Sequence, residues 1–210
     1  LQYLHLVANN GIIPFKMLSQ DTYDYFLKLP GYNTLRILLA NHAILVEGPA
    51  DELIVQRAYI DNYGKQPIEA GIDVVTVDSL AFQRYCELSS LIKKPITIVT
   101  DNDGNVQKVK ERYKKYGELV TLCVESDNSL NTLEPSVLAV NLDNFEEFKA
   151  IVYYGKDIES RDIESIKNFM LGNKTEWSMR VLTSKKRIKY PTYILEAIGI
   201  ADKHRSDVDD

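Results

Sequence analysis

The chain has 210 residues, of which 45% are hydrophobic and 26% charged, and its formal net charge is −5. This length allows one domain with a sizeable core, or one domain with a helical appendage. The acidic balance argues against a protein that coats DNA by bulk electrostatics, but it permits an enzyme that gathers carboxylates in one place and basic residues in another. No apolar run reaches the ~18 residues of a membrane span, and residues 1–10 lack the features of a signal peptide.

The N-terminal region, residues 1–40, is predicted to be a helical lead-in. Residues 21–29 repeat apolar side chains at near-helical spacing and end at the breaker pair Pro30-Gly31. A second short helix is expected over residues 33–41.

Apolar runs and helical patterns alternate between residues 43 and 122. The runs occupy residues 43–47, 71–77, 95–100 and 119–124, and helical spacing covers the intervening residues 51–63, 80–91 and 106–116. Strands alternating with helices in this way indicate βαβ units, and continuous apolar strands are typical of a parallel sheet that is covered on both faces. The fold class indicated is α/β, with a parallel sheet flanked by helices over about residues 41–135.

Residues 136–200 lack such strand runs and predict a C-terminal helical segment. Helices are expected over residues 141–153, 158–171, 174–184 and 191–199. No long Gly/Ser or Pro linker separates them from the sheet, so we expect the segment to pack on it. The polar residues 201–210 are expected to form a flexible tail.

Cys86 and Cys123 are the two cysteines of the chain. Neither belongs to a CxxC motif or a Cys/His cluster, which argues against a zinc site. We interpret them as buried thiols and expect a cytoplasmic protein, because the cytoplasm is reducing.

Acidic residues follow two of the predicted strands. Glu47 ends the first apolar run, and Asp101 and Asp103 follow the third, with Asp51 one turn into the helix after Gly48. Ligands of open parallel sheets bind beyond the C-terminal ends of the strands, so these acids are expected to share one rim. Carboxylate oxygens are the ligands that Mg²⁺ prefers.

Each acidic motif also has a simpler explanation. Asp-Asn-Asp-Gly is a common turn, and it resembles part of an EF-hand loop, although no Glu follows at the required spacing. Glu47 alone could be a favourable charge at a helix N-terminus. The recurrence of an acid in the same setting two strands later favours a metal site for the set.

These motifs resemble the Toprim domain, the metal-binding domain shared by topoisomerases, primases and OLD-family nucleases. The resemblance is carried by residues 44–53, 71–75 and 97–104. The domain has an acid after its first strand and Asp-x-Asp after its third, and Glu47, Asp101 and Asp103 occupy those positions.

Further stretches are similar to the OLD (overcoming lysogenization defect) family in particular. Residues 29–36, leading into the Glu47 motif, are similar to the entry into OLD-family Toprim domains. Thr132-Leu-Glu-Pro135 resembles the family's Leu-Glu motif, which implies that Glu134 is a ligand of a second metal ion. Residues 173–180 resemble a Lys-Thr-Glu-x-Ala stretch, which implies that Lys174 is a catalytic lysine; its simpler explanation is a solvated helix residue.

Two positions depart from the family pattern. Ser178 stands where Ala is usual, and Ala50 stands where Ser is frequent. The resemblance covers about residues 29–199.

The resemblance implies a metal-dependent DNA endonuclease in which two Mg²⁺ or Mn²⁺ ions act on the scissile phosphate. Under this hypothesis Glu47, Asp51 and Asp101 hold the first ion, Asp103 and Glu134 support the second, and Lys174 stabilises charge on the phosphate. A role of Glu47 as general base stays open. Positive charge is concentrated over residues 108–115 and 180–190; within the latter, Lys185, Lys186, Arg187 and Lys189 are interpreted as a solvated or DNA-tracking face.

OLD-family proteins also have an N-terminal ABC-type ATPase. The sequence contains no Gly-x-x-x-x-Gly-Lys-Ser/Thr loop, so the resemblance implies the nuclease portion, with ATP used only by a separate ATPase domain. It further implies a role in phage defence, with DNA, a homodimer or a helicase-like protein as partners and no membrane.

Three alternatives stay open at this stage. The same acids could serve a topoisomerase or primase, although none of the 13 tyrosines stands in a distinctive setting. They could belong to a DNA-binding module that does not cut. A receiver domain of the response-regulator kind also has acidic strand ends, but the paired motifs fit it poorly.

Overall fold

The computed structural model describes residues 5–8, 11–28, 32–78 and 81–206. Its strands are β1 His5–Ala8, β2 Gly11–Pro14, β3 His42–Val46, β4 Ile72–Thr76, β5 Ile96–Thr100 and β6 Val120–Val124. Its α-helices are α1 Gln20–Lys28, α2 Tyr32–Leu39, α3 Pro49–Tyr63, α4 Phe82–Ile92, α5 Val106–Tyr113, α6 Leu133–Ala139, α7 Phe145–Val152, α8 Ile163–Gly172, α9 Lys174–Thr183 and α10 Thr192–Ser206. Short 3-10 helices are η1 Phe15–Met17, η2 Pro67–Ala70, η4 Lys114–Leu119, η5 Leu142–Asn144 and η6 Ile158–Ser160.

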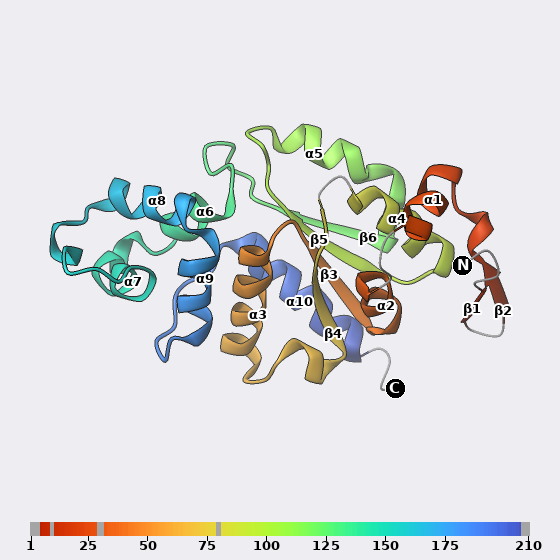
Figure 1. Ribbon diagram of the computed structural model, residues 1–210, viewed down its shortest axis with the longest axis horizontal. Helices are drawn as coiled ribbons and strands as arrows, with labels where there is room; N and C mark the ends of the chain where they lie inside the picture. The colour runs from red at the N-terminus through yellow and green to blue at the C-terminus, as the bar shows by residue number, and fades with distance from the viewer. Residues whose placement is uncertain (1–4, 9–10, 29–31, 79–80, 207–210) are drawn as a thin grey trace.

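A four-stranded parallel sheet forms the centre of the molecule, in the order β4-β3-β5-β6 (Figure 1). The four predicted apolar runs are these four strands, which confirms the α/β prediction. In this order β3 and β5 are hydrogen-bonded neighbours, so the residues that follow Val46 and Thr100 leave the sheet side by side.

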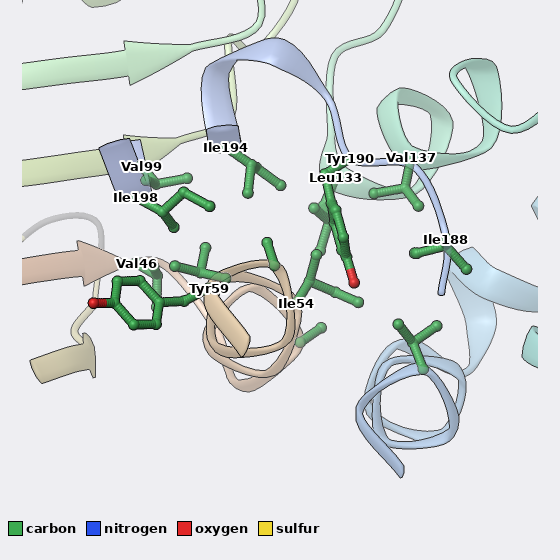
Figure 2. Packing of buried hydrophobic residues seen from close by; sticks show 14 of the residues in the cluster. Val46, Ile54, Tyr59, Val99, Leu133, Val137, Ile188, Tyr190, Ile194 and Ile198 are labelled. Atoms are coloured by element: carbon green, nitrogen blue, oxygen red, sulfur yellow. The ribbon is translucent and has the colours of Figure 1, made fainter. Parts of the chain in front are cut away.

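The two faces of the sheet support two separate hydrophobic cores. Ile44 and Val46 point to one face and pack with α3, α10 and the C-terminal helices, whereas Ala43 and Leu45 point to the other and pack with α1, α2, α4 and α5. Figure 2 shows the first core, where Val46 lies near the side chains of α3 and α10. Because both faces are buried, every residue of β3 had to be apolar or internally hydrogen-bonded, and this produced the continuous run in the sequence.

Strand β4 is an edge strand whose outer main-chain groups are occupied by side chains. Asn33 Nδ2 donates to the carbonyl of Thr76 at 3.0 Å, and Arg36 Nη2 donates to the carbonyl of Val74 at 2.7 Å. The main-chain N–H of Thr76 donates to Glu52 Oε2 at 3.2 Å. The edge is therefore covered by side chains from α2 and α3.

The C-terminal helical segment packs on the sheet, as its lack of a linker predicted. Helix α10 lies across the face of β3, β5 and β6, and α9 lies alongside α3 (Figure 1). The four predicted helices correspond to α7 with η5, α8 with η6, α9 and α10. Within the described ranges, no helix combines the length and apolar character that a membrane crossing requires.

A buried arginine joins α3 to the end of α9. Arg57, on α3, is 7% exposed. Its guanidinium donates to four main-chain carbonyls at the end of α9 and just beyond it: Val181 at 3.0 Å, Leu182 at 2.7 Å, Ser184 at 2.6 Å and Lys186 at 3.1 Å. Arg57 Nε also donates to Asp61 at 3.0 Å. One side chain therefore satisfies carbonyls that a helix end leaves without partners, and it fixes α9 against α3.

Two sequence-based expectations were wrong. Part of the predicted helical lead-in is instead an antiparallel pair of strands, β1 and β2. The sequence Asn9-Asn10-Gly11 between them is a turn signal that is typical of such a pair. The predicted flexible tail is helical as far as Ser206, because Ala201 is buried and Asp202 accepts a hydrogen bond from Tyr59 at 2.8 Å. The expected helix end at Pro30-Gly31 lies outside the described residues.

Replacing Arg57 should cost much of the stability of the protein. Arg57→Gln breaks a buried ion pair and leaves several carbonyls without donors, so we expect a loss of about 3 kcal/mol in the free energy of unfolding. Urea denaturation measures this loss. Arg161→Gln, which removes an ion pair with Asp157 at the surface, serves as the matched control and should change stability by less than about 1 kcal/mol.

Candidate functional site

Glu47 and Asp101 meet at the C-terminal edge of the sheet. The main-chain N–H of Asp101 donates to Glu47 Oε1 at 3.2 Å, and the hydroxyl of Thr100 donates to the same oxygen. The two strand ends therefore contact one another directly, as the strand pattern predicted.

Asp51 joins this edge from the first turn of α3. Its carboxylate accepts a hydrogen bond from the main-chain N–H of Gly48 at 3.1 Å, which caps the helix at the residue before Pro49, its first residue. The N-terminus of α3, with its positive end of the helix dipole, thus lies beside the acids.

The loop after β5 is held by its middle residue. Asn102 is fully buried and donates to the carbonyls of Glu125 at 3.0 Å and Asp127 at 2.9 Å, while its own oxygen accepts from the N–H of Gly104 at 2.8 Å. Asp103 occupies the turn with a left-handed φ of 51° and is exposed to solvent. The structure thus places Asp101 inside the site and Asp103 on the turn at its margin.

Glu134 and Lys174 reach the same region from the helical segment. Glu134 lies in the first turn of α6, is 1% exposed, and accepts a hydrogen bond from Thr132 at 3.0 Å through Oε2. Its other oxygen, Oε1, accepts no hydrogen bond and has the ammonium group of Lys174 at 3.4 Å. Lys174 is the first residue of α9, and its side chain is half exposed.

Burial and mutual repulsion raise the pKa values of two of these acids, Asp51 and Asp101. Burial, followed by the charges of Glu47 and Glu134, raises the pKa of Asp51 to about 7. Burial, followed by the charges of Asp51, Glu47 and Glu134, raises the pKa of Asp101 to about 8. Lys174 acts in the opposite direction on both, but one cation does not balance four carboxyl groups.

We call Glu47, Asp51, Asp101 and Glu134 the acid cluster. Its chemistry fits a divalent cation, because it offers hard oxygen donors, contains a buried oxygen without a hydrogen bond, and carries excess negative charge. Among the described residues, however, no three Asp, Glu, His or Cys side chains are arranged as a ready-made metal site. The cluster is therefore a collection of suitable donors rather than a preformed cage.

Three neighbours of the acid cluster were missed by sequence reasoning. Thr100 donates to Glu47, and Glu125 follows β6 in the same way that Asp101 follows β5. The strand-end rule would have found Glu125 had it been applied to the fourth run. Tyr193 of α10 is 5% exposed, and burial together with the charges of Asp51 and Asp101 raises its pKa; no sequence signal marks it.

The expected DNA-tracking residues lie beyond the end of α9, and three of the four are paired with acids. Lys186 lies 3.1 Å from Glu147, Arg187 lies 3.7 Å from Asp61, and Lys189 forms an ion pair with Asp143. Lys185 is exposed. Three of these four positive charges thus have an acidic group within ion-pair distance, although the basic side chains remain exposed.

A parallel sheet that gathers acids from its first and third strands at one rim is the arrangement of a TOPRIM domain. Residues 38–103 match the family described as "Overcoming lysogenization defect protein-like, TOPRIM domain". Residues 38–103 are therefore similar to an OLD-like TOPRIM domain, as the motifs predicted. The matched residues include Glu47, Asp51 and Asp101 but not Glu134 or Lys174.

Solved structures show the same fold over a longer stretch. The C-terminal region of the Xanthomonas campestris pv. campestris OLD protein is 19% identical, with a TM-score of 0.59, and the similarity covers 83% of this chain and 100% of that one. The C-terminal region of the Burkholderia pseudomallei OLD protein is 16% identical, with a TM-score of 0.55 and coverage of 79% and 98%. At these identities the likeness shows the fold alone. No curated protein matches the chain.

The metal-free protein should become less stable as pH rises from about 5 to about 8. Asp51 and Asp101 have pKa values above the unfolded value of about 4, so the folded state binds more protons across this window and loses that advantage as they dissociate. Thermal denaturation in EDTA measures the slope. Asp101→Asn should flatten it, and the remote exposed acid Glu118, changed to Gln, should not. A melting temperature that rises steadily with pH would contradict the prediction.

Proposed function

We propose that this chain is the nuclease portion of an OLD-type protein and hydrolyses DNA phosphodiester bonds in a metal-dependent reaction. The observation that carries the proposal is the convergence of four carboxyl groups and one lysine from five separate elements, with the pKa values of two carboxyl groups raised by burial and then by the neighbouring carboxylates. Such a cluster is costly for stability, which is typical of a site that serves chemistry.

The acid cluster would hold Mg²⁺ or Mn²⁺. Asp103, on the turn after β5, would add its carboxylate as a further ligand. When bound, such ions supply Lewis-acid stabilisation of the phosphate and an activated water. The residues of the chain prepare this chemistry. Thr100 and the N–H of Asp101 orient the Glu47 carboxylate, and the N–H of Gly48 orients that of Asp51.

Lys174 would bind the scissile phosphate. Its ammonium group lies at the acid cluster, yet half of its side chain remains open to solvent, so a phosphate can approach it. A fixed cation here would stabilise the additional negative charge that develops on the phosphate during attack by water.

The biological setting follows from the domain family. We propose duplex DNA as substrate, an ABC-type ATPase domain in the same full-length protein, and a role in phage defence in the cytoplasm. The support is the OLD-like TOPRIM match and the fold shared with C-terminal regions of OLD proteins.

A topoisomerase function is less well supported. Topoisomerases attack DNA with a tyrosine. Tyr193, whose pKa is raised by burial and then by the charges of Asp51 and Asp101, is 5% exposed within the core. A hydroxyl in that position cannot reach a DNA strand without opening the packing around α10.

Glu47→Gln should abolish most DNA nicking. The change removes one carboxylate of the acid cluster while keeping its size, so we expect at least a ~100-fold slower conversion of supercoiled plasmid to nicked or linear DNA in Mn²⁺. Glu118→Gln, a matched change at an exposed acid, should cut normally. Nicking at the wild-type rate by Glu47→Gln would refute the proposal.

Lys174→Gln should separate phosphate stabilisation from metal binding. We expect about a 100-fold loss of nicking rate, because a donor to the developing charge is lost. The stabilisation of the protein by Mn²⁺, measured as a shift in melting temperature, should persist. Lys167→Gln on α8, which loses only an ion pair with Glu164, is the control. Equal rates for the two variants would remove Lys174 from the reaction.

A further inference from the structure

A second concentration of positive charge lies on α5 and the turn after it. Between residues 106 and 116 the sequence holds Lys108, Lys110, Arg112, Lys114 and Lys115 against the single acid Glu111. All five basic side chains are exposed. In a chain with a net charge of −5, such a local excess stands out as a surface that attracts anions.

The charges of α5 are less compensated than those of residues 185–189. Of the five basic residues, Lys114 is the one with an acidic group within ion-pair distance among the described residues, Glu111 at 3.6 Å, whereas three of the four basic residues at 185–189 have such a partner. Among the described residues, Lys108, Lys110 and Arg112 have no acidic partner in an ion pair. They therefore retain their charge for an external ligand, in contrast to Lys186, Arg187 and Lys189.

Helix α5 follows the loop that carries Asp101 and is fixed to the loop after β6, which also holds Asn102 of the Asp101 loop. The main-chain N–H of Val106 donates to Asn128 Oδ1 at 2.9 Å, and the side chain of Asn105 caps the helix by accepting from the N–H of Lys108 at 3.1 Å. Val109 and Tyr113 anchor the opposite side of the helix in the second core. The exposed basic side chains thus have a defined position relative to the acid cluster.

The distances suit a strand of DNA. Val106 is five positions after Asp101, so the helix begins less than about 18 Å from that residue of the acid cluster. Lys108 and Arg112 are one helical turn apart, about 6 Å, which is close to the axial rise of two nucleotides. Helix α5 lies beside β6 (Figure 1). A duplex cut at the acid cluster can therefore place neighbouring phosphates along this helix.

We infer that Lys108, Lys110 and Arg112 of α5 form the main surface that binds the DNA backbone, and that residues 185–189 contribute little. This inference rests on the proposed function, because the DNA bound by α5 is the substrate of the acid cluster. The contacts are to phosphates, so the binding is independent of base sequence and sensitive to salt.

The test compares two triple variants of equal charge change. One carries Lys108→Gln, Lys110→Gln and Arg112→Gln; the other carries Lys186→Gln, Arg187→Gln and Lys189→Gln. Binding of a labelled duplex of about 30 base pairs is measured by fluorescence anisotropy over a range of salt concentrations, in EDTA so that no cutting intervenes. Circular dichroism and melting temperature verify that both variants fold.

We expect the α5 variant to bind at least about 10-fold more weakly near 0.1 M salt and to show a salt slope reduced by 2 to 3, about one for each lost phosphate contact. The variant at residues 186–189 should stay within about 3-fold of wild type. Wild-type affinity in the α5 variant, or a wild-type protein that binds anionic lipid vesicles in preference to DNA, overturns the inference.

The experiment distinguishes this inference from the proposed function. If DNA binding depends on α5 but plasmid is never cut in Mg²⁺ or Mn²⁺, the nuclease proposal fails and the binding surface stands. If plasmid is cut and the α5 variant cuts with unchanged KM, the surface fails and the nuclease stands.

Discussion

The contact between the buried Arg57 guanidinium and the carbonyls at the end of α9 ties the helical segment to the sheet domain. Helices α3 and α9 lie side by side, and each begins at the acid cluster, α3 just ahead of Asp51 and α9 at Lys174. Arg57 lies six residues beyond Asp51, and Val181 lies seven beyond Lys174, so the contact fixes how far α9 can slide along α3. The position of Lys174 relative to the acids depends on that register.

Repulsion between its own carboxyl groups opposes the formation of the acid cluster. Four carboxyl groups in a half-buried space repel one another, and the fold offsets this with main-chain N–H donors, a threonine hydroxyl, the N-terminus of α3 and one lysine. These groups offset part of the cost, and burial together with the remaining repulsion still raises the pKa values of Asp51 and Asp101. The surrounding core, buried on both faces of the sheet, supplies the stability that the site lacks.

Much of the sheet and half of the candidate site could be predicted from local sequence. Strands that are buried on both faces must be apolar throughout, so their positions and the acids at their ends were visible, and Glu47 and Asp101 followed directly. Glu134 and Lys174 came from the family resemblance alone, because they lie on helices whose approach depends on distant contacts such as that of Arg57. No local pattern could bring them to the sheet.

The other differences between the sequence-based predictions and the structure also arise from contacts between distant segments. The exposure of Asp103 depends on the buried amide of Asn102, whose partners lie more than 20 residues further on. The basic residues between 186 and 189 form ion pairs with Asp61, Asp143 and Glu147, and no spacing rule connects these acids to them. Sequence patterns thus predicted elements and strand ends well, and charge pairing between distant segments poorly.

The covered edge of β4 has a consequence for assembly. Asn33, Arg36 and Glu52 take up the carbonyl of Val74 and both main-chain groups of Thr76, so a strand from another molecule would have to displace these side chains before it could pair there. Growth of the sheet into a continuous intermolecular β-structure is therefore disfavoured on this side.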